Sequence, residues 1–387
     1  MTIGVRGATP IEGAAAFDPV AAARSLAPFV RDHADEAEDL RRLPRAVAEA
    51  LRDAGLMRLC VPAAYGGPEC DPMTMVRAVV EVARADGAAG WCTMIASTTS
   101  SMACFLEPAW ARTIYGDPTV VTGGAYAPTG TGRRAEGGWI VNGTWGWGSG
   151  TSHCDWIVGG ANTDDGGFHL MFAPASEVEL LDTWYSSGLR GTGSTDFRMT
   201  DVFVPDGRSL QPRVGTPTID SPIARFPNYN LLAAGIAAAA LGIARRAVDE
   251  ILDLAQGKRP IYSSRTLAQS PIAQVDIARA EAAVSSATAF LLDELSVAWD
   301  AAASSGHIPV EQRIRTRIAC TNAAQESARA VDLAYNQGGG SSVFSGNVLQ
   351  RCFRDVHTAT QHVMVSTRIL ETAGKFLLGL DADTSMI

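Results

Sequence analysis

The sequence predicts an α+β protein of three parts: an N-terminal helical domain (residues 18–121), a middle β-sandwich or barrel (122–217) and a C-terminal four-helix bundle (218–387). Near residue 120 glycine, threonine and tryptophan become frequent and the apolar spacing shortens toward two, which is typical of strands. From residue 228 the helical period returns over four long segments, 228–256, 270–304, 309–337 and 348–373, as expected for an antiparallel bundle.

The first third of the chain is predicted to be helical throughout. Apolar residues at helical spacing extend over 20–54, and Pro44 marks the start of a second helix within that stretch. Asp71 followed by Pro72 supplies an N-cap and a first helical residue for a helix that runs to residue 85. Two further helices are expected at 91–105 and 108–115. The middle third shows short alternating runs separated by glycine pairs, and the expected strands cover 139–142, 155–160, 168–173, 177–182 and 195–205.

Composition excludes several classes of protein. The net charge is −9 and no basic run occurs, which argues against nucleic acid as a partner. The seven cysteines are scattered and never spaced as CxxC, so neither a disulfide framework nor a metal site is predicted, and we expect reduced thiols in the cytoplasm. The longest apolar run, 231–243, is about half a membrane span and is expected to be a buried helix, not a membrane segment.

The last long segment carries a candidate catalytic residue. Residues 347–376 are read as one helix that ends near Gly374. Thr358, His362 and Ser366 recur every fourth residue, so on a helix they share one face beside an apolar stripe. A histidine presented in this way is either a half-buried group hydrogen-bonded into the bundle or a functional group.

Two stretches of the middle part could line a site, although the common catalytic fingerprints are absent. The first, GWIVNGTWGWGSGTSHCDW at 138–156, pairs a strand with a loop in which Trp147 offers a flat apolar wall and Ser149 a hydroxyl. The second, GLRGTGSTDFRMTDVFVP at 188–205, is a turn that leads into a strand. Trp147 could equally belong to the core, and the Ser149 hydroxyl could simply bond to backbone.

The order of these parts resembles the acyl-CoA dehydrogenase superfamily over roughly residues 20–380. Further matching segments are RRAVDEILDLA at 245–255, the Arg265 segment followed by PIAQ, QGGGSSVFSGN at 337–347 and RDVHTATQHVMVS at 354–366. The resemblance implies a flavin between the β domain and the C-terminal bundle, in a homotetramer whose neighbouring subunit helps to hold the cofactor.

Within that superfamily the chain is more similar to the reduced-flavin monooxygenases. Dehydrogenases carry a catalytic glutamate after an Arg-Asp pair, and aligning that pair on Arg354 and Asp355 places Val363 where the glutamate would be. The Gln361-His362 pair followed by a V-x-x-S run resembles the reduced-flavin monooxygenases instead, as do GLRGTGS at 188–194 and the W-x-W-x-S-G pattern at 145–150. This resemblance implies the oxygenase component of a two-component system, which takes FMNH2 or FADH2 from a separate flavin reductase and uses O2 to oxygenate a small aromatic or amine-type substrate through a C4a-hydroperoxyflavin. An FAD-dependent acyl-CoA dehydrogenase with its base elsewhere, and a non-catalytic flavin-binding member, remain the alternatives.

The same resemblance assigns roles to individual residues. His362 would assist deprotonation of a phenol or stabilise the peroxide, and Ser149 would lie beside flavin N5. Trp147 would cover the flavin, and Trp91 would be a wall of the substrate site, unless it belongs to the core. The expected contacts to the rest of the cofactor come from a phosphate-binding arginine across a subunit boundary and from a segment of close backbone approach, namely Arg265, Gln337, Gly338 and Gly339.

Overall fold

The computed structural model describes residues 17–212, 215–304 and 306–387. Its N-terminal part is helical, as predicted. Asp71 caps the fourth helix by accepting from Thr74 N, and that helix ends at Ala85, where the sequence placed its end. The helices of this part are α1 (Pro19–Asp32), α2 (Ala34–Leu40), α3 (Arg45–Asp53), α4 (Pro72–Ala85), α5 (Gly87–Ser100) and α6 (Pro108–Tyr115).

The middle part is a seven-stranded sheet in the order β5-β6-β2-β1-β3-β4-β7, and this confirms the predicted β domain. Its strands are β1 (Thr122–Ala135), β2 (Gly138–Gly148), β3 (Trp156–Thr163), β4 (Phe168–Pro174), β5 (Glu179–Leu181), β6 (Thr195–Pro205) and β7 (Ser209–Leu210). The central strand β1 was not among the expected strands, since Pro128 and several glycines resemble a loop. The strand accommodates them through a register shift between Ala125 and Gly130, where it pairs with β3.

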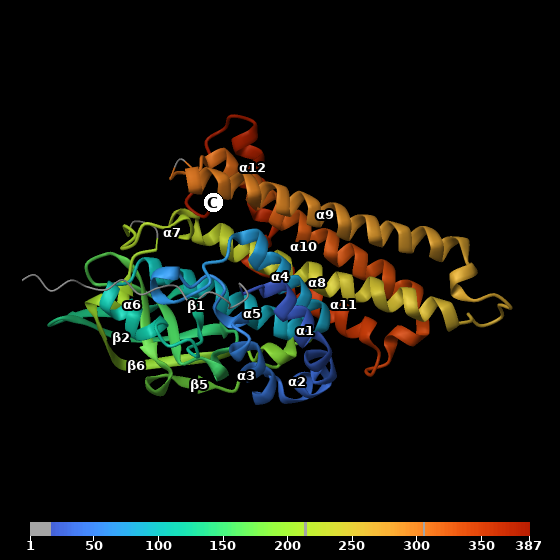
Figure 1. Ribbon diagram of the computed structural model, residues 1–387, viewed down its shortest axis with the longest axis horizontal. Helices are drawn as coiled ribbons and strands as arrows, with labels where there is room; N and C mark the ends of the chain where they lie inside the picture. The colour runs from blue at the N-terminus through green and yellow to red at the C-terminus, as the bar shows by residue number, and fades with distance from the viewer. Residues whose placement is uncertain (1–16, 213–214, 305) are drawn as a thin grey trace, which may run out of the picture.

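The C-terminal part is a helical bundle that extends from the sheet domain to the opposite end of the molecule (Figure 1). Its helices are α7 (Pro222–Arg225), α8 (Asn228–Gly257), α9 (Pro271–Ser304), α10 (Val310–Gly338), α11 (Val348–Ala359) and α12 (Thr367–Leu377). Among the described residues, α8 alone is long and apolar enough to cross a membrane, but 83% of its apolar window is buried inside the protein. The apolar run within it is therefore a core helix, as expected.

The prediction of one continuous last helix is wrong. The chain leaves the helix after Ala359, forms a short 3-10 turn at Val363–Val365 and begins a new helix at Thr367. His362 lies in this break with extended backbone (φ −69°, ψ 130°), so it does not share a helical face with Thr358 and Ser366. Val363, an apolar residue of this segment that a continuous helix would be expected to bury, is 57% exposed. The break frees His362 from the helical repeat and lets its side chain turn toward the N-terminal helices.

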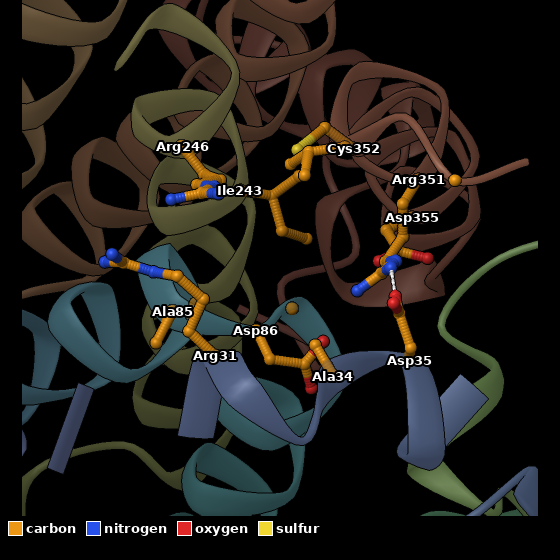
Figure 2. A pocket seen from close by; sticks show the side chains of 14 residues that line it. Arg31, Ala34, Asp35, Ala85, Asp86, Ile243, Arg246, Arg351, Cys352 and Asp355 are labelled. Carbon is orange, nitrogen blue, oxygen red and sulfur yellow. Dashed lines mark hydrogen bonds and ion pairs between the residues drawn. The ribbon is translucent and has the colours of Figure 1, made fainter. Parts of the chain in front are cut away.

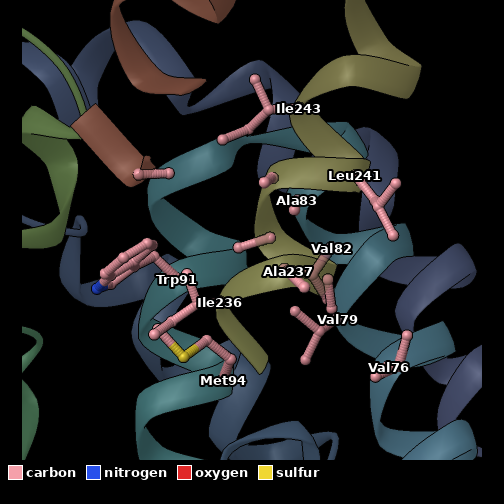
Figure 3. Close-up of a cluster of buried hydrophobic side chains, with 14 of the residues drawn as sticks. Val76, Val79, Val82, Ala83, Trp91, Met94, Ile236, Ala237, Leu241 and Ile243 are labelled. Carbon is pink, nitrogen blue, oxygen red and sulfur yellow. The ribbon is translucent and has the colours of Figure 1, made fainter. Parts of the chain in front are cut away.

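Helix α5 joins the three parts of the molecule. It packs against α4 and α8 in the main core and also contacts β1 of the sheet. Figure 3 shows Trp91 at the edge of this core, with Met94 and Ile236 beside it and the indole nitrogen directed away from the aliphatic side chains. The packing leaves the polar edge of one large aromatic ring available at the junction with the sheet.

Candidate active site

Trp91, Ser149 and His362 come from three different parts of the chain and meet at one place. Trp91 Nε1 donates a hydrogen bond to Ser149 Oγ at 3.0 Å. The rings of Trp91 and His362 lie 5.8 Å apart between centroids, tilted by 57°. Trp91 and Ser149 are only 6% and 4% exposed. The structure thus brings together three residues that the sequence singled out separately, with Trp91 as the common contact.

The Ser149 hydroxyl bonds to side chains and not to backbone. Besides Trp91, its partner is Ser194 Oγ at 2.6 Å, and Ser194 Oγ in turn lies 2.6 Å from Thr192 Oγ1. Thr192 and Ser194 belong to the GLRGTGS turn, which is held against the Ser149 loop because Gly150 N donates to Thr192 O at 2.9 Å. Sequence reasoning noted this turn for its resemblance but did not identify its two hydroxyl groups as neighbours of Ser149.

His362 has a neutral ring with a defined tautomer. Its Nδ1 accepts from Met364 N at 3.2 Å, so in the neutral form the ring proton resides on Nε2. Burial, and then the Arg317 guanidinium, lower the pKa of His362 to about 4. The ring therefore presents a neutral Nε2–H donor at pH 7 and not a free basic nitrogen.

Arg317 on α10 holds the turn that follows His362 through a hydrogen bond to Met364 O. The residue is fully buried, and within the described residues its guanidinium donates to three backbone carbonyls, at 2.9 Å to Met364 O, 3.0 Å to Met386 O and 3.3 Å to Tyr229 O. The sequence did contain a signal for it, since position 317 continues the buried face of Ile314 and Thr321 on α10. A charged residue on a buried face was not recognised among the many arginines.

A second buried group fixes the turn on the other side of the site. Asp355 Oδ1 accepts from Leu189 N at 2.6 Å, so α11 holds the residue that directly precedes the 3-10 turn Arg190–Thr192. Asp355 and Asp86 line a cavity of about 150 Å³ between the N-terminal helices and α11 (Figure 2). Burial raises the pKa of Asp355 to about 7 and that of Asp86 to about 6. Asp355, read in the sequence only as part of a family motif, thus supports the site.

The remaining candidates do not belong to this buried cluster. Trp147 has left-handed backbone (φ 61°) and is 75% exposed, so it is not part of the core; Trp139 and Trp145 of the same strand are buried, and Trp145 Nε1 donates to Gly160 O at 2.8 Å. Arg265 is exposed in the connection between α8 and α9. Figure 1 shows this connection at the end of the bundle remote from the sheet.

Gln337, Gly338 and Gly339 share that remote end. Lys258, at the start of the Arg265 connection, donates to Gly338 O and to Ser341 Oγ, which ties the end of α10 to this connection. Gln337 Nε2 donates to Asp276 Oδ2 at 2.7 Å, and Gly339 ends the helix with φ 52°. One chain therefore does not bring these four residues to Ser149 and His362.

Comparison with known proteins places this geometry among flavoenzymes. Residues 20–107 match the acyl-CoA dehydrogenase N-terminal domain, and residues 234–367 match the acyl-CoA dehydrogenase C-terminal domain. The indole-3-acetate monooxygenase of Pseudomonas putida is 32% identical over 90% of this chain and 91% of its own length. The flavin-dependent monooxygenase oxygenase subunit HsaA of Mycobacterium tuberculosis is 32% identical over 92% of this chain and 93% of its own.

Solved structures of flavin-dependent monooxygenases have the same fold as this chain. The HsaA monooxygenase from M. tuberculosis superposes with a TM-score of 0.89 at 32% identity, covering 96% of this chain and 100% of that one. XiaF from Streptomyces sp., solved in complex with FADH2 and glycerol, superposes with a TM-score of 0.88 at 26% identity, covering 94% and 96% of the two chains.

Proposed function

The chain belongs to the flavin-dependent monooxygenase branch of the acyl-CoA dehydrogenase superfamily, and on that premise we propose that it is an oxygenase component which uses reduced flavin and O2 to oxygenate a small aromatic molecule. The observation that carries this proposal is the meeting of Trp91, Ser149 and a neutral His362 at one buried place. Reduced FMN or FAD, delivered by a separate flavin reductase, would supply the chemistry that activates O2 and transfers one oxygen atom.

The residues present fit such a cofactor. After bonding to Trp91 and Ser194, the Ser149 hydroxyl keeps one further hydrogen-bonding position, which suits a position beside flavin N5. The exposed Trp147, two residues before it, offers a flat apolar face for a ring system. Trp91 would form one wall of the substrate site, where its ring and that of His362 exclude water.

The tautomer of His362 favours one of the two roles that the resemblance implies. Because Nδ1 is occupied by Met364 N–H, Nε2 carries the proton and can donate a hydrogen bond to an oxygen atom. Such a donor stabilises a phenolate or another negatively charged oxygen in a dry site. Removal of a phenolic proton by the same nitrogen would require the ring to give up its bond to the backbone.

The position that holds the base in the dehydrogenases carries no acid in this chain. Val363, at the position of the family's glutamate, is a valine that is 57% exposed. Asp355, the buried acid nearest in the sequence, is bonded to Leu189 N instead.

Arg265, Gln337, Gly338 and Gly339 would contact the cofactor of a neighbouring subunit in a homotetramer. Their position at the remote end of the bundle supports this reading, and so do several exposed apolar side chains around them. These are Ile261, Tyr262, Ile272, Val343 and Phe344, all more than two-thirds exposed. We expect Arg265→Ala to weaken flavin binding without lowering monomer stability. Gel filtration of the wild type should show a tetramer. A monomer that binds flavin as tightly as the wild-type assembly would refute this arrangement.

Oxygen incorporation tests the proposed function directly. The protein is mixed anaerobically with photoreduced FMN or FAD and then with 18O2 in the presence of a panel of phenols and indoles. We expect a product that carries one labelled oxygen atom, and we expect Ser149→Ala and His362→Gln to reduce its yield relative to flavin consumed. Oxygen uptake no greater than that of free reduced flavin, with no labelled product, would favour a non-catalytic protein. Reduction of the oxidised flavin by an acyl thioester would favour the dehydrogenase.

A further inference from the structure

Three hydroxyl groups form a buried hydrogen-bonded chain that ends at Ser149. Ser149 Oγ lies 2.6 Å from Ser194 Oγ, Ser194 Oγ lies 2.6 Å from Thr192 Oγ1, and Thr192 Oγ1 lies 2.8 Å from the carbonyl oxygen of Leu189. Ser149, Thr192 and Ser194 are each at most 4% exposed. Because every hydroxyl carries a single proton, the direction of the whole chain follows from the group at its end.

That end group fixes the direction. A carbonyl oxygen can only accept, so the Thr192 proton goes to Leu189 O. Ser194 must then donate to Thr192, and Ser149 must donate to Ser194. Trp91 Nε1–H fills one acceptor position of Ser149 Oγ. Ser149 is left with one acceptor position and no proton to offer to a ligand.

We propose that Thr192 and Ser194 are positioning residues which make Ser149 an obligate hydrogen-bond acceptor, so that the site selects reduced over oxidised flavin. The inference rests on the proposed function, in which Ser149 faces flavin N5. Reduced flavin carries a proton on N5, whereas N5 of oxidised flavin has only a lone pair. An acceptor oxygen gains a hydrogen bond from the first and meets another acceptor in the second.

The carbonyl at the end of the chain cannot easily turn away. Leu189 has left-handed backbone (φ 50°), and its N–H is bonded to Asp355. Its carbonyl also accepts from Thr192 N at 3.1 Å and from Trp184 Nε1 at 3.2 Å. Removal of the Thr192 hydroxyl therefore leaves the carbonyl with two donors, so Thr192→Val should keep the turn. In this variant the donor direction between Ser194 and Ser149 is no longer fixed.

Anaerobic equilibrium binding tests the proposal without catalysis. Dissociation constants are measured for reduced and for oxidised FMN and FAD, and the ratio of the two is compared between variants. We expect the wild type to favour the reduced form. In Thr192→Val, Ser194 can donate to Ser149, and the Ser149 proton becomes free for the flavin; in Ser194→Ala the same proton loses its acceptor. Each substitution should lower the preference by about 3- to 10-fold, the usual net effect of one hydrogen bond.

Two matched variants complete the experiment. Thr192→Ser retains the hydroxyl and should retain the preference. Thr98→Val removes a buried hydroxyl that donates only to Met94 O and Ile95 O of its own helix, and should leave the ratio unchanged. An unchanged ratio in Ser194→Ala, or equal losses in Thr192→Val and Thr192→Ser, overturns the proposal while the proposed function stands. A wild type that binds neither form of flavin overturns both.

Discussion

The charge on Arg317 should control the protonation of His362. The pKa of His362 is about 4, against about 6.5 for an ordinary histidine, and burial is the larger of its two causes. Arg317 therefore accounts for less than half of a difference of about 2.5, so Arg317→Met should raise the pKa of His362 by up to about 1. Arg317→Lys keeps the charge and should leave the pKa near its wild-type value.

The two substitutions separate charge from position. Both remove guanidinium donors from the carbonyls of Tyr229, Met364 and Met386, so both should lower stability, by roughly 1–3 kcal/mol for the loss at the buried Met364 carbonyl. Only Arg317→Met should move the titration. At pH 5 the neutral fraction of His362 should then fall from about 90% to about 50%.

Long-range 15N NMR of histidine-labelled protein measures this titration. The protein has six histidines, and His362→Gln identifies the signal of interest. Arg313→Met is the matched control, because Arg313 lies one turn earlier on α10 and is not a cause of the lowered pKa. A His362 pKa that is unchanged in Arg317→Met, or that rises equally in Arg317→Lys, would refute the reasoning.

Two further predictions concern the turn that holds Thr192. Burial raises the folded-state pKa of Asp355 to about 7, so its contribution to stability is present at low pH and is lost as the pH rises from about 4 to about 7. Asp355→Asn keeps an acceptor for Leu189 N. Above pH 7 the free energy of unfolding of this variant, measured in urea, should exceed that of the wild type by on the order of 4 kcal/mol. A difference in unfolding free energy that does not grow with pH would contradict this. Gly188→Ala places a Cβ 2.1 Å from Arg354 O and should lower the melting temperature by several degrees, whereas Gly374→Ala on α12, with nothing within 4 Å, should not; equal effects would count against the packing argument.

Much of the architecture could be read from the sequence because it depends on local signals. The change of apolar period near residue 120 reports the start of the sheet domain, and Asp71 with Pro72 marks a helix start within one residue. The central strand β1 carries no such signal. Its Pro128 and glycines suggest a turn, and only pairing with β2 and β3 makes the segment a strand.

The residues that touch one another at the site were recognised one at a time, through family resemblance. Their meeting was not predictable, since it depends on a break in the last helix that its apolar pattern conceals. The segment around His362 keeps helical spacing, yet His362 caps a 3-10 turn through Met364 N, and Arg317 on a distant helix holds that turn. Such long-range bonds to backbone leave no periodic trace.

The contributions of α5, the sheet loops and the α11–α12 break to one site have a consequence for folding intermediates. A species in which the bundle has formed but the sheet domain has not docked would show most of the native helical signal by circular dichroism, yet it would lack the contact between Trp91 and Ser149. Quenching of tryptophan fluorescence by added flavin should therefore recover later during refolding than ellipticity does, and it would report the assembled enzyme where helix content cannot.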